Sequence, residues 1–149
     1  VVRGRANFTR YQVDLFAGGG LKMTINLTQA QKLQELGVKV KSLKVWGVMN
    51  EDYREKPRIA DTWTDTGIYD NTYSAYNAEE LIKLLRSKEH HPIDIYSHGD
   101  GFMFHNDGSE IAGQDDIYGD SLTECLANEL IYMLENGVIT AEEINGNSL

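Results

Sequence analysis

The sequence is poor in the residues that mark secreted, linker and membrane proteins. Its 149 residues include one cysteine, two prolines and no apolar run near the roughly 18–20 residues that span a bilayer. The lone cysteine, Cys125, cannot form a disulfide within the chain, which excludes a disulfide-built secreted scaffold. No hydrophobic signal segment stands at the start. With 41% apolar and 25% charged residues, the composition is that of an ordinary globular domain, and we expect it in the cytoplasm, away from membranes.

Basic side chains are missing from the last part of the chain. The sequence has no Lys or Arg after Lys88, and all the charged residues that follow are acidic. They are Glu89, Asp94, Asp100, Asp107, Glu110, Asp115, Asp116, Asp120, Glu124, Glu129, Glu135, Glu142 and Glu143. Acidic domains usually keep some Lys among their acids because mixed signs relieve self-repulsion. The acidic residues could form a surface that only keeps the protein in solution. The complete lack of Lys and Arg favours instead a functional acidic face, which would attract a basic groove or a divalent cation.

The first third of the chain has the opposite charge. Residues 1–49 hold eight basic and two acidic side chains, whereas residues 50–149 hold six and 21. Lys39, Lys41 and Lys44 lie close together near the edge of one predicted strand. Aromatic residues are interleaved with the basic ones, a pattern typical of proteins that bind single-stranded nucleic acid.

Residues 1–49 follow a β-β-α-β pattern. Apolar alternation predicts strands over 11–15 and 21–27, joined by the glycine loop 17–20 in a hairpin. A helix to about residue 36 and a strand over 43–49 complete this part.

The remainder of the chain follows a β-α-β-β-α pattern. Over the whole chain, capping-box pairs predict three helix starts. One lies in the first third, at Thr28 with Gln31, and two lie in the remainder, at Asn77 with Glu80 and at Thr140. A further amphipathic helix is predicted after Asp120 and Ser121.

The pattern as a whole predicts an α+β fold, with small antiparallel hairpin sheets packed against two to three amphipathic helices. We interpret residues 1–149 as one domain with two candidate subdomains, a basic ββαβ part (1–49) and an acidic βαββα part (73–149). The stretch 50–72 between them is expected to be an ordered long loop or a weak hairpin, because Trp63 anchors it.

A histidine-rich hairpin is predicted from strands over 93–97 and 102–105. Side-chain parity places Asp94, Tyr96, His98, Met103 and His105 together on a solvated face, opposite a face of Ile and Phe. Two histidines and one carboxylate, namely His98, His105 and Asp94, form a candidate metal set. The alternative is a polar cross-strand pair between Asp94 and His105.

Two segments of the chain resemble phage proteins. Within residues 10–41, the run 10–15 followed by 27–41 resembles segments of phage single-stranded-DNA-binding proteins, where a strand leads to a short helix ending in Leu-Gly before a basic strand. Residues 76–139 resemble small uncharacterised proteins of phages and mobile elements, with a closing helix like 129–137. The resemblance implies a small accessory protein that acts by binding in the host-cell cytoplasm. Such proteins include blockers of bacterial defence systems that imitate nucleic-acid charge.

Three functions are compatible with these features. The first is a non-enzymatic phage or mobile-element protein without a cofactor, whose acidic surface blocks a basic, nucleic-acid-handling host protein. This partner would be a nuclease or a guide-RNA effector. The protein would then act as an inhibitor of the anti-CRISPR or anti-restriction type. The predicted contact residues are Asp107, Glu110, Asp115, Asp116, Asp120 and Glu124. The second is a single-stranded-DNA-binding protein that uses Lys39, Lys41 and Lys44, and the third is a metal-dependent hydrolase that uses the histidine set.

Overall fold

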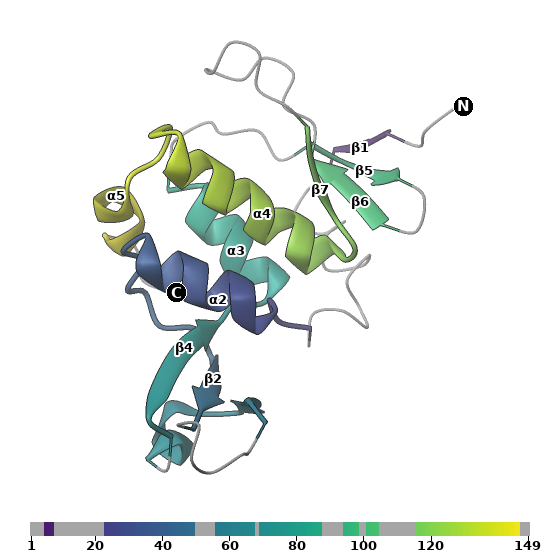
Figure 1. Ribbon diagram of the computed structural model, residues 1–149. Helices are drawn as coiled ribbons and strands as arrows, with labels where there is room; N and C mark the ends of the chain where they lie inside the picture. Colours follow the sequence, from purple (N-terminus) through teal and green to yellow (C-terminus); the bar gives the residue numbers. More distant parts are fainter. Residues whose placement is uncertain are drawn as a thin grey trace.

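A computed structural model shows an α+β fold, in which helices pack between two small antiparallel sheets (Figure 1). The described residues are 5–7, 23–49, 56–67, 69–87, 94–98, 101–104 and 116–146. The predicted fold class is confirmed. The predicted strand 11–15 and the glycine loop 17–20 lie outside the described residues.

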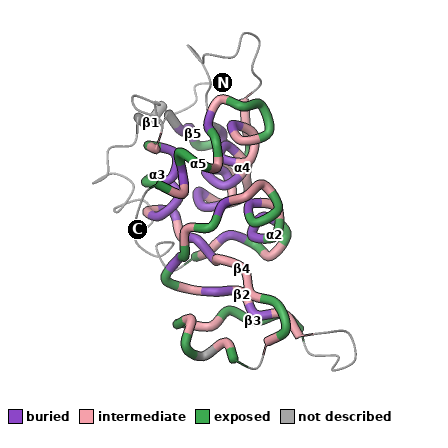
Figure 2. Tube along the Cα trace, turned by 90° about the vertical axis from the view of Figure 1, so that its left-hand side faces the viewer, coloured by how far each residue is buried: buried purple, intermediate pink, exposed green. Residues whose placement is uncertain are grey.

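Three helices form the centre of the molecule. They are α2 (Leu27–Glu35), α3 (Ala78–Leu85) and α4 (Leu122–Glu135). Helix α4 packs against both α2 and α3, and the short α5 (Ala141–Asn145) follows it. Buried positions concentrate along these helices (Figure 2). Each fully buried Leu, such as Leu81 or Leu126, stabilises the fold by roughly 1.5–3 kcal/mol.

The helix starts are fixed by side-chain caps. The box of Asn77 and Glu80 is confirmed, and so is the one at Thr140. The predicted start of α2 at Thr28 is wrong, because Asn26 is the N-cap and Gln29 its partner. The same sequence spacing occurs two residues earlier, and the side chain of Asn26 accepts a hydrogen bond from the Gln29 N–H at 2.8 Å.

The predicted strand 21–27 is also wrong over its described part. Thr24 makes an isolated bridge to Asn77, and Leu27 already belongs to α2. The N-cap at Asn26 ends the extended conformation, because helical geometry begins at the next residue.

A four-stranded antiparallel sheet packs against α4. Its order is β1 (Arg5–Asn7), β5 (Asp94–His98), β6 (Gly101–Phe104) and β7 (Ile117–Gly119). The register pairs Ile95 with Phe104 and Tyr96 with Met103, which confirms the predicted sharing of faces. Phe102 and Ile117 pack against the helical core.

The expectation that the Tyr96 face is solvated is wrong at two positions. Tyr96 is 9% exposed and Met103 only 4%, whereas Tyr118, opposite Met103 on β7, is 51% exposed. The alternation of side chains along a strand determines which residues share a face of the sheet. It does not determine how far each residue on that face is buried.

A three-stranded antiparallel sheet extends from the other end of the helices (Figure 1). Its order is β3 (Arg58–Ala60), β2 (Lys44–Val48) and β4 (Asn71–Ala75). A 3₁₀ turn, η2 (Trp63–Thr66), lies between β3 and β4. Within the stretch 50–72, strand β3 pairs with β2, which lies outside it, and not with β4, so its described residues form no hairpin among themselves.

One hydrophobic core draws on both predicted subdomains. Ile25 and Leu33 from the basic part lie in the same buried cluster as Leu81 and Leu130 from the acidic part. Strand β2 also pairs with β4 across the predicted division. No helix in the described part of the chain is long and apolar enough to cross a membrane.

Candidate binding site

One surface concavity lies where the N-terminal ends of α2 and α4 meet the β6–β7 edge of the four-stranded sheet. We call it the acidic hollow. Its volume is about 670 Å³, and it is open to solvent. It is lined by Asn26, Thr28, Gln29, Gly101, Phe102, Tyr118, Gly119, Asp120, Glu124 and Asn128.

The floor of the acidic hollow is held by amide hydrogen bonds. The Nε2 of Gln29 donates to the Asn128 side chain at 2.8 Å and to the Glu124 carbonyl at 3.1 Å. Asn128 in turn donates to the Tyr118 carbonyl at 2.8 Å. Gln29 is buried, so these bonds satisfy its polar group and tie α2, α4 and β7 into one rigid surface.

Close backbone contact fixes the sheet side of the acidic hollow. A Cβ at Gly119 would lie 2.3 Å from the backbone nitrogen of Cys125, and one at Gly101 would lie 2.5 Å from the Gly119 carbonyl oxygen. The absence of side chains at these two glycines lets β6 and β7 approach the first turn of α4 closely.

Two carboxylates are the charged groups of the acidic hollow. Asp120 is exposed and Glu124 is half-buried, and no Lys or Arg is among the lining residues that the structure describes. Asp120 directly precedes Ser121, the N-cap of α4, and Glu124 lies in the first turn of the helix. Negative charge at this end complements the helix dipole. The Glu124 carboxylate has the Asn26 amide as a neighbour at 3.5 Å. Both groups can therefore attract a cationic side chain from outside.

The structure brings together only part of the predicted acidic set. Asp120 and Glu124 line the acidic hollow, Asp116 is half-buried just before β7, and Asp107, Glu110 and Asp115 lie outside the described residues.

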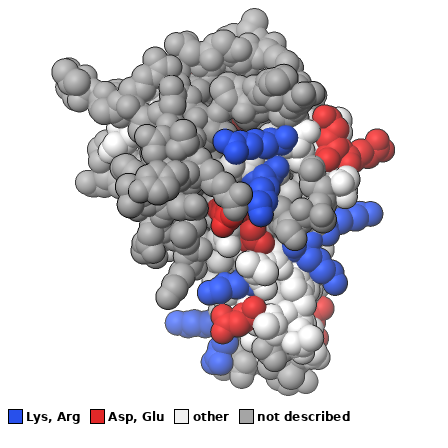
Figure 3. Space-filling view, turned by 180° about the vertical axis from the view of Figure 1, so that it is seen from behind, with Lys and Arg blue, Asp and Glu red and all other residues white. Residues whose placement is uncertain are grey.

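The acid-only end of the chain does not form one uninterrupted acidic surface. Glu129 is fully buried within α4, and Glu135 lies 3.8 Å from Lys32 of α2. One face of the molecule carries Lys and Arg side chains with Asp and Glu among them (Figure 3). The packing of α2 against α4 therefore pairs one lysine of the basic third with one carboxylate of the acid-only end, which offsets part of the charge separation along the sequence.

A second, smaller concavity contains two of the predicted basic residues. We call it the lysine hollow; its volume is about 240 Å³. It is lined by Ala30, Leu33, Gln34, Val38, Lys39, Lys41, Trp63, Thr72, Ser74 and Tyr76. The Lys41 ammonium lies 5.0 Å from the centre of the Trp63 ring, a cation–π contact. Lys44 is not among the lining residues and forms an ion pair with Asp61 at 3.7 Å.

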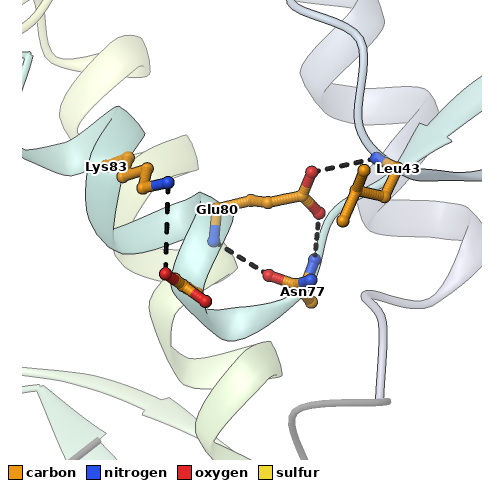
Figure 4. Close-up of polar contacts among 5 residues, drawn as sticks. Leu43, Asn77, Glu80 and Lys83 are labelled. Atoms are coloured by element: carbon orange, nitrogen blue, oxygen red, sulfur yellow. Dashed lines mark hydrogen bonds and ion pairs between the residues drawn. The ribbon is translucent and has the colours of Figure 1, made fainter. Parts of the chain in front are cut away.

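A buried carboxylate connects α3 to the segment before β2 (Figure 4). Glu80 accepts hydrogen bonds from the Asn77 N–H at 3.0 Å and from the Leu43 N–H at 2.9 Å. Burial raises the pKa of Glu80, and the two backbone hydrogen bonds counteract part of that rise. Both oxygens are occupied within the protein, so Glu80 has a structural role.

The predicted metal set is only partly described. Asp94 and His98 stand four residues apart on β5, about 13 Å along an extended strand, a spacing that does not favour a shared ion. His105 lies outside the described residues. Among the described residues, no group of three or more His, Cys, Asp or Glu side chains has a metal-binding arrangement.

Sequence reasoning missed the polar neighbours that shape both hollows. Gln29 and Asn128 come from helices 95 or more positions apart in the sequence, and Asn145 reaches from α5 to the Lys39 N–H. The sequence gives little signal for them, because Asn128 is one of several polar residues on the amphipathic α4. Comparison of the chain with protein-family models, with curated proteins and with solved structures found no match.

Proposed function

We propose that this protein is a non-enzymatic binding protein of phage or mobile-element type, whose acidic hollow receives basic side chains of a nucleic-acid-handling host protein. The observation that carries the proposal is the lining of the acidic hollow, where Asp120 and Glu124 are the charged groups. Carboxylates on a rigid surface can occupy the positions that phosphates take in a basic groove.

The rigidity of the acidic hollow supports this use. Its amide floor and its two close-packed glycines leave little freedom to be lost when a partner binds. Arginine is the side chain best suited to it, because a guanidinium bonds carboxylate and amide oxygens in one plane.

Two alternatives stay predictions with less support. Single-stranded DNA binding would be favoured by a continuous row of lysines. Lys44 is paired with Asp61, so only Lys39 and Lys41 of the three predicted lysines line the lysine hollow. For metal-dependent hydrolysis, the spacing of Asp94 and His98 on β5 is unfavourable.

The proposal is tested on DNA cleavage by two defined nucleases, one guided by CRISPR RNA and one restriction enzyme. We expect the protein to inhibit at least one of them near equimolar amounts. The triple variant Asp116→Asn, Asp120→Asn, Glu124→Gln should lose at least tenfold in potency. Undiminished inhibition by this variant would show that the acidic hollow is not the contact, and no inhibition of either enzyme would count against a nuclease partner.

A further inference from the structure

The lysine hollow combines two positive charges with an aromatic ring. Lys39 and Lys41 line it, and none of its lining residues that the structure describes is acidic. Two carboxylates of neighbouring segments are engaged elsewhere: Asp61 pairs with Lys44, and Glu80 accepts the Leu43 N–H. Among the described lining residues, an anion entering the hollow would therefore meet two positive charges and no carboxylate.

The backbone that carries the two lysines is held in place by side chains of other elements. Asn145 accepts the Lys39 N–H at 2.7 Å and donates to the Gly37 carbonyl at 2.9 Å. The Val40 carbonyl, between the lysines, accepts hydrogen bonds from the hydroxyls of Ser74 and Tyr76. Val40 packs against the core, whereas the lysines on either side of it are exposed. The backbone that carries both lysines is thus fixed, so no loop has to be ordered when a ligand binds.

The aromatic side of the lysine hollow is fixed as well. The Trp63 Nε1 donates to the Ser42 carbonyl at 2.7 Å, so the indole cannot turn freely. Lys41 rests against the ring through an exposed cation–π contact, which is weak and can be exchanged for a phosphate. Indole rings stack on nucleobases of any identity.

The size of the lysine hollow suits a small ligand. Its volume of about 240 Å³ equals the share of about eight water molecules in the liquid. This is below the roughly 300–1,000 Å³ of sites for drug-sized ligands. A hollow of this size that is open to solvent can hold the base and the phosphate of a single nucleotide, but not several nucleotides of a polymer.

From these features we infer that the lysine hollow binds a free nucleoside monophosphate, with its phosphate at Lys39 and Lys41 and its base against Trp63. This site is separate from the acidic hollow, and its test does not depend on the proposed function.

The test is a calorimetric titration of the full chain with adenosine monophosphate at low salt. The variant Lys39→Gln, Lys41→Gln should bind at least about tenfold more weakly, because both phosphate contacts are lost. Its matched control is Lys83→Gln, Arg86→Gln, which removes two exposed positive charges from α3 and its end and should bind within twofold of the wild type. Trp63→Ala should weaken nucleotide binding but leave the affinity for inorganic phosphate unchanged.

Four results would overturn the inference. They are no binding of the nucleotide at low salt, equal losses in the two double variants, equal affinity for inorganic phosphate and the nucleotide, and binding of a single-stranded oligonucleotide without binding of the mononucleotide. The last result would instead assign the lysines to a nucleic-acid strand.

Discussion

Tyr76 shows how one buried polar group holds the backbone of the lysine hollow in place. It is 1% exposed, and its hydroxyl donates to the Val40 carbonyl between the two lysines of the lysine hollow. Burial raises the pKa of Tyr76 to about 12, because the phenolate would lose its hydration. The stability linked to this proton is therefore complete below pH 10.0, its ordinary pKa, and is lost as the pH rises toward 12.

Replacing Tyr76 by Phe tests this contact. We expect a loss of about 1 kcal/mol in the free energy of unfolding, because the Val40 carbonyl retains its bond from Ser74. In an absorbance titration of tyrosinate, the wild type should contain one group that ionises near pH 12, and the variant should lack it. The same late-ionising group in both proteins would show that another tyrosine is responsible.

Glu80 gives a pH dependence of the same sign as Tyr76, but in acid rather than in alkali. Its pKa in the folded protein is raised above the ordinary 4.5, so the folded state binds this proton more tightly than the unfolded chain does. The resulting stability is fully present below pH 4.5 and is lost as pH rises through the raised pKa.

The variant Glu80→Gln removes this titration. It also places an amide NH₂ against one of two backbone N–H donors, so we expect it to be less stable than the wild type by about 1–3 kcal/mol. Urea unfolding between pH 4 and 7 should show the advantage of the wild type at its largest in acid and shrinking as pH rises. An advantage that stays constant or grows with pH would contradict this assignment.

At the scale of elements, the start of α2 shows what local sequence decides and what it leaves open. Both Asn26 with Gln29 and Thr28 with Gln31 have capping-box spacing, and the structure uses the first pair. The helix that begins at Leu27 buries Gln29, Ala30 and Leu33, but its local sequence does not distinguish the two boxes.

The variant Asn26→Ala tests the assigned cap. It should lower the free energy of unfolding by about 0.5–2 kcal/mol, because the Gln29 N–H loses its acceptor. The matched control Thr28→Ala, at the exposed residue that the sequence favoured, should change it by less than about 0.5 kcal/mol. Thermal or urea unfolding of both variants measures the difference, and a larger loss in Thr28→Ala would restore the predicted start.

Other elements followed from the sequence because their signals are local. The amphipathic α4 and the capping box of Asn77 and Glu80 both agree with the patterns. The sites did not follow, because their residues meet through packing. Gln29 reaches Asn128, and Trp63 reaches the Ser42 carbonyl, only after the chain has folded.

At the scale of the whole molecule, folding reduces the charge asymmetry that the sequence displays. Lys32 of the basic third lies beside Glu135 of the acid-only part, Lys44 beside Asp61, and Glu129 is buried. The net charge of −9 nevertheless remains, and it favours basic partners over nucleic acid at long range. The described lining residues of the two concavities carry charges of opposite sign, so the proposed anion site and the proposed acidic partner surface are compatible.

The central claim is that the carboxylates of the acidic hollow, rather than net charge, bind basic groups. The most direct measurement is fluorescence anisotropy of a labelled arginine-rich peptide, titrated at low and moderate salt with two double variants. One is Asp120→Asn, Glu124→Gln in the hollow; its control is Glu35→Gln, Glu142→Gln, which removes the same charge from exposed positions elsewhere. The account predicts at least about a tenfold loss of affinity for the first variant and less than about twofold for the control, at equal thermal stability. Equal losses in both variants would contradict it, because they would show that the peptide senses only the net charge.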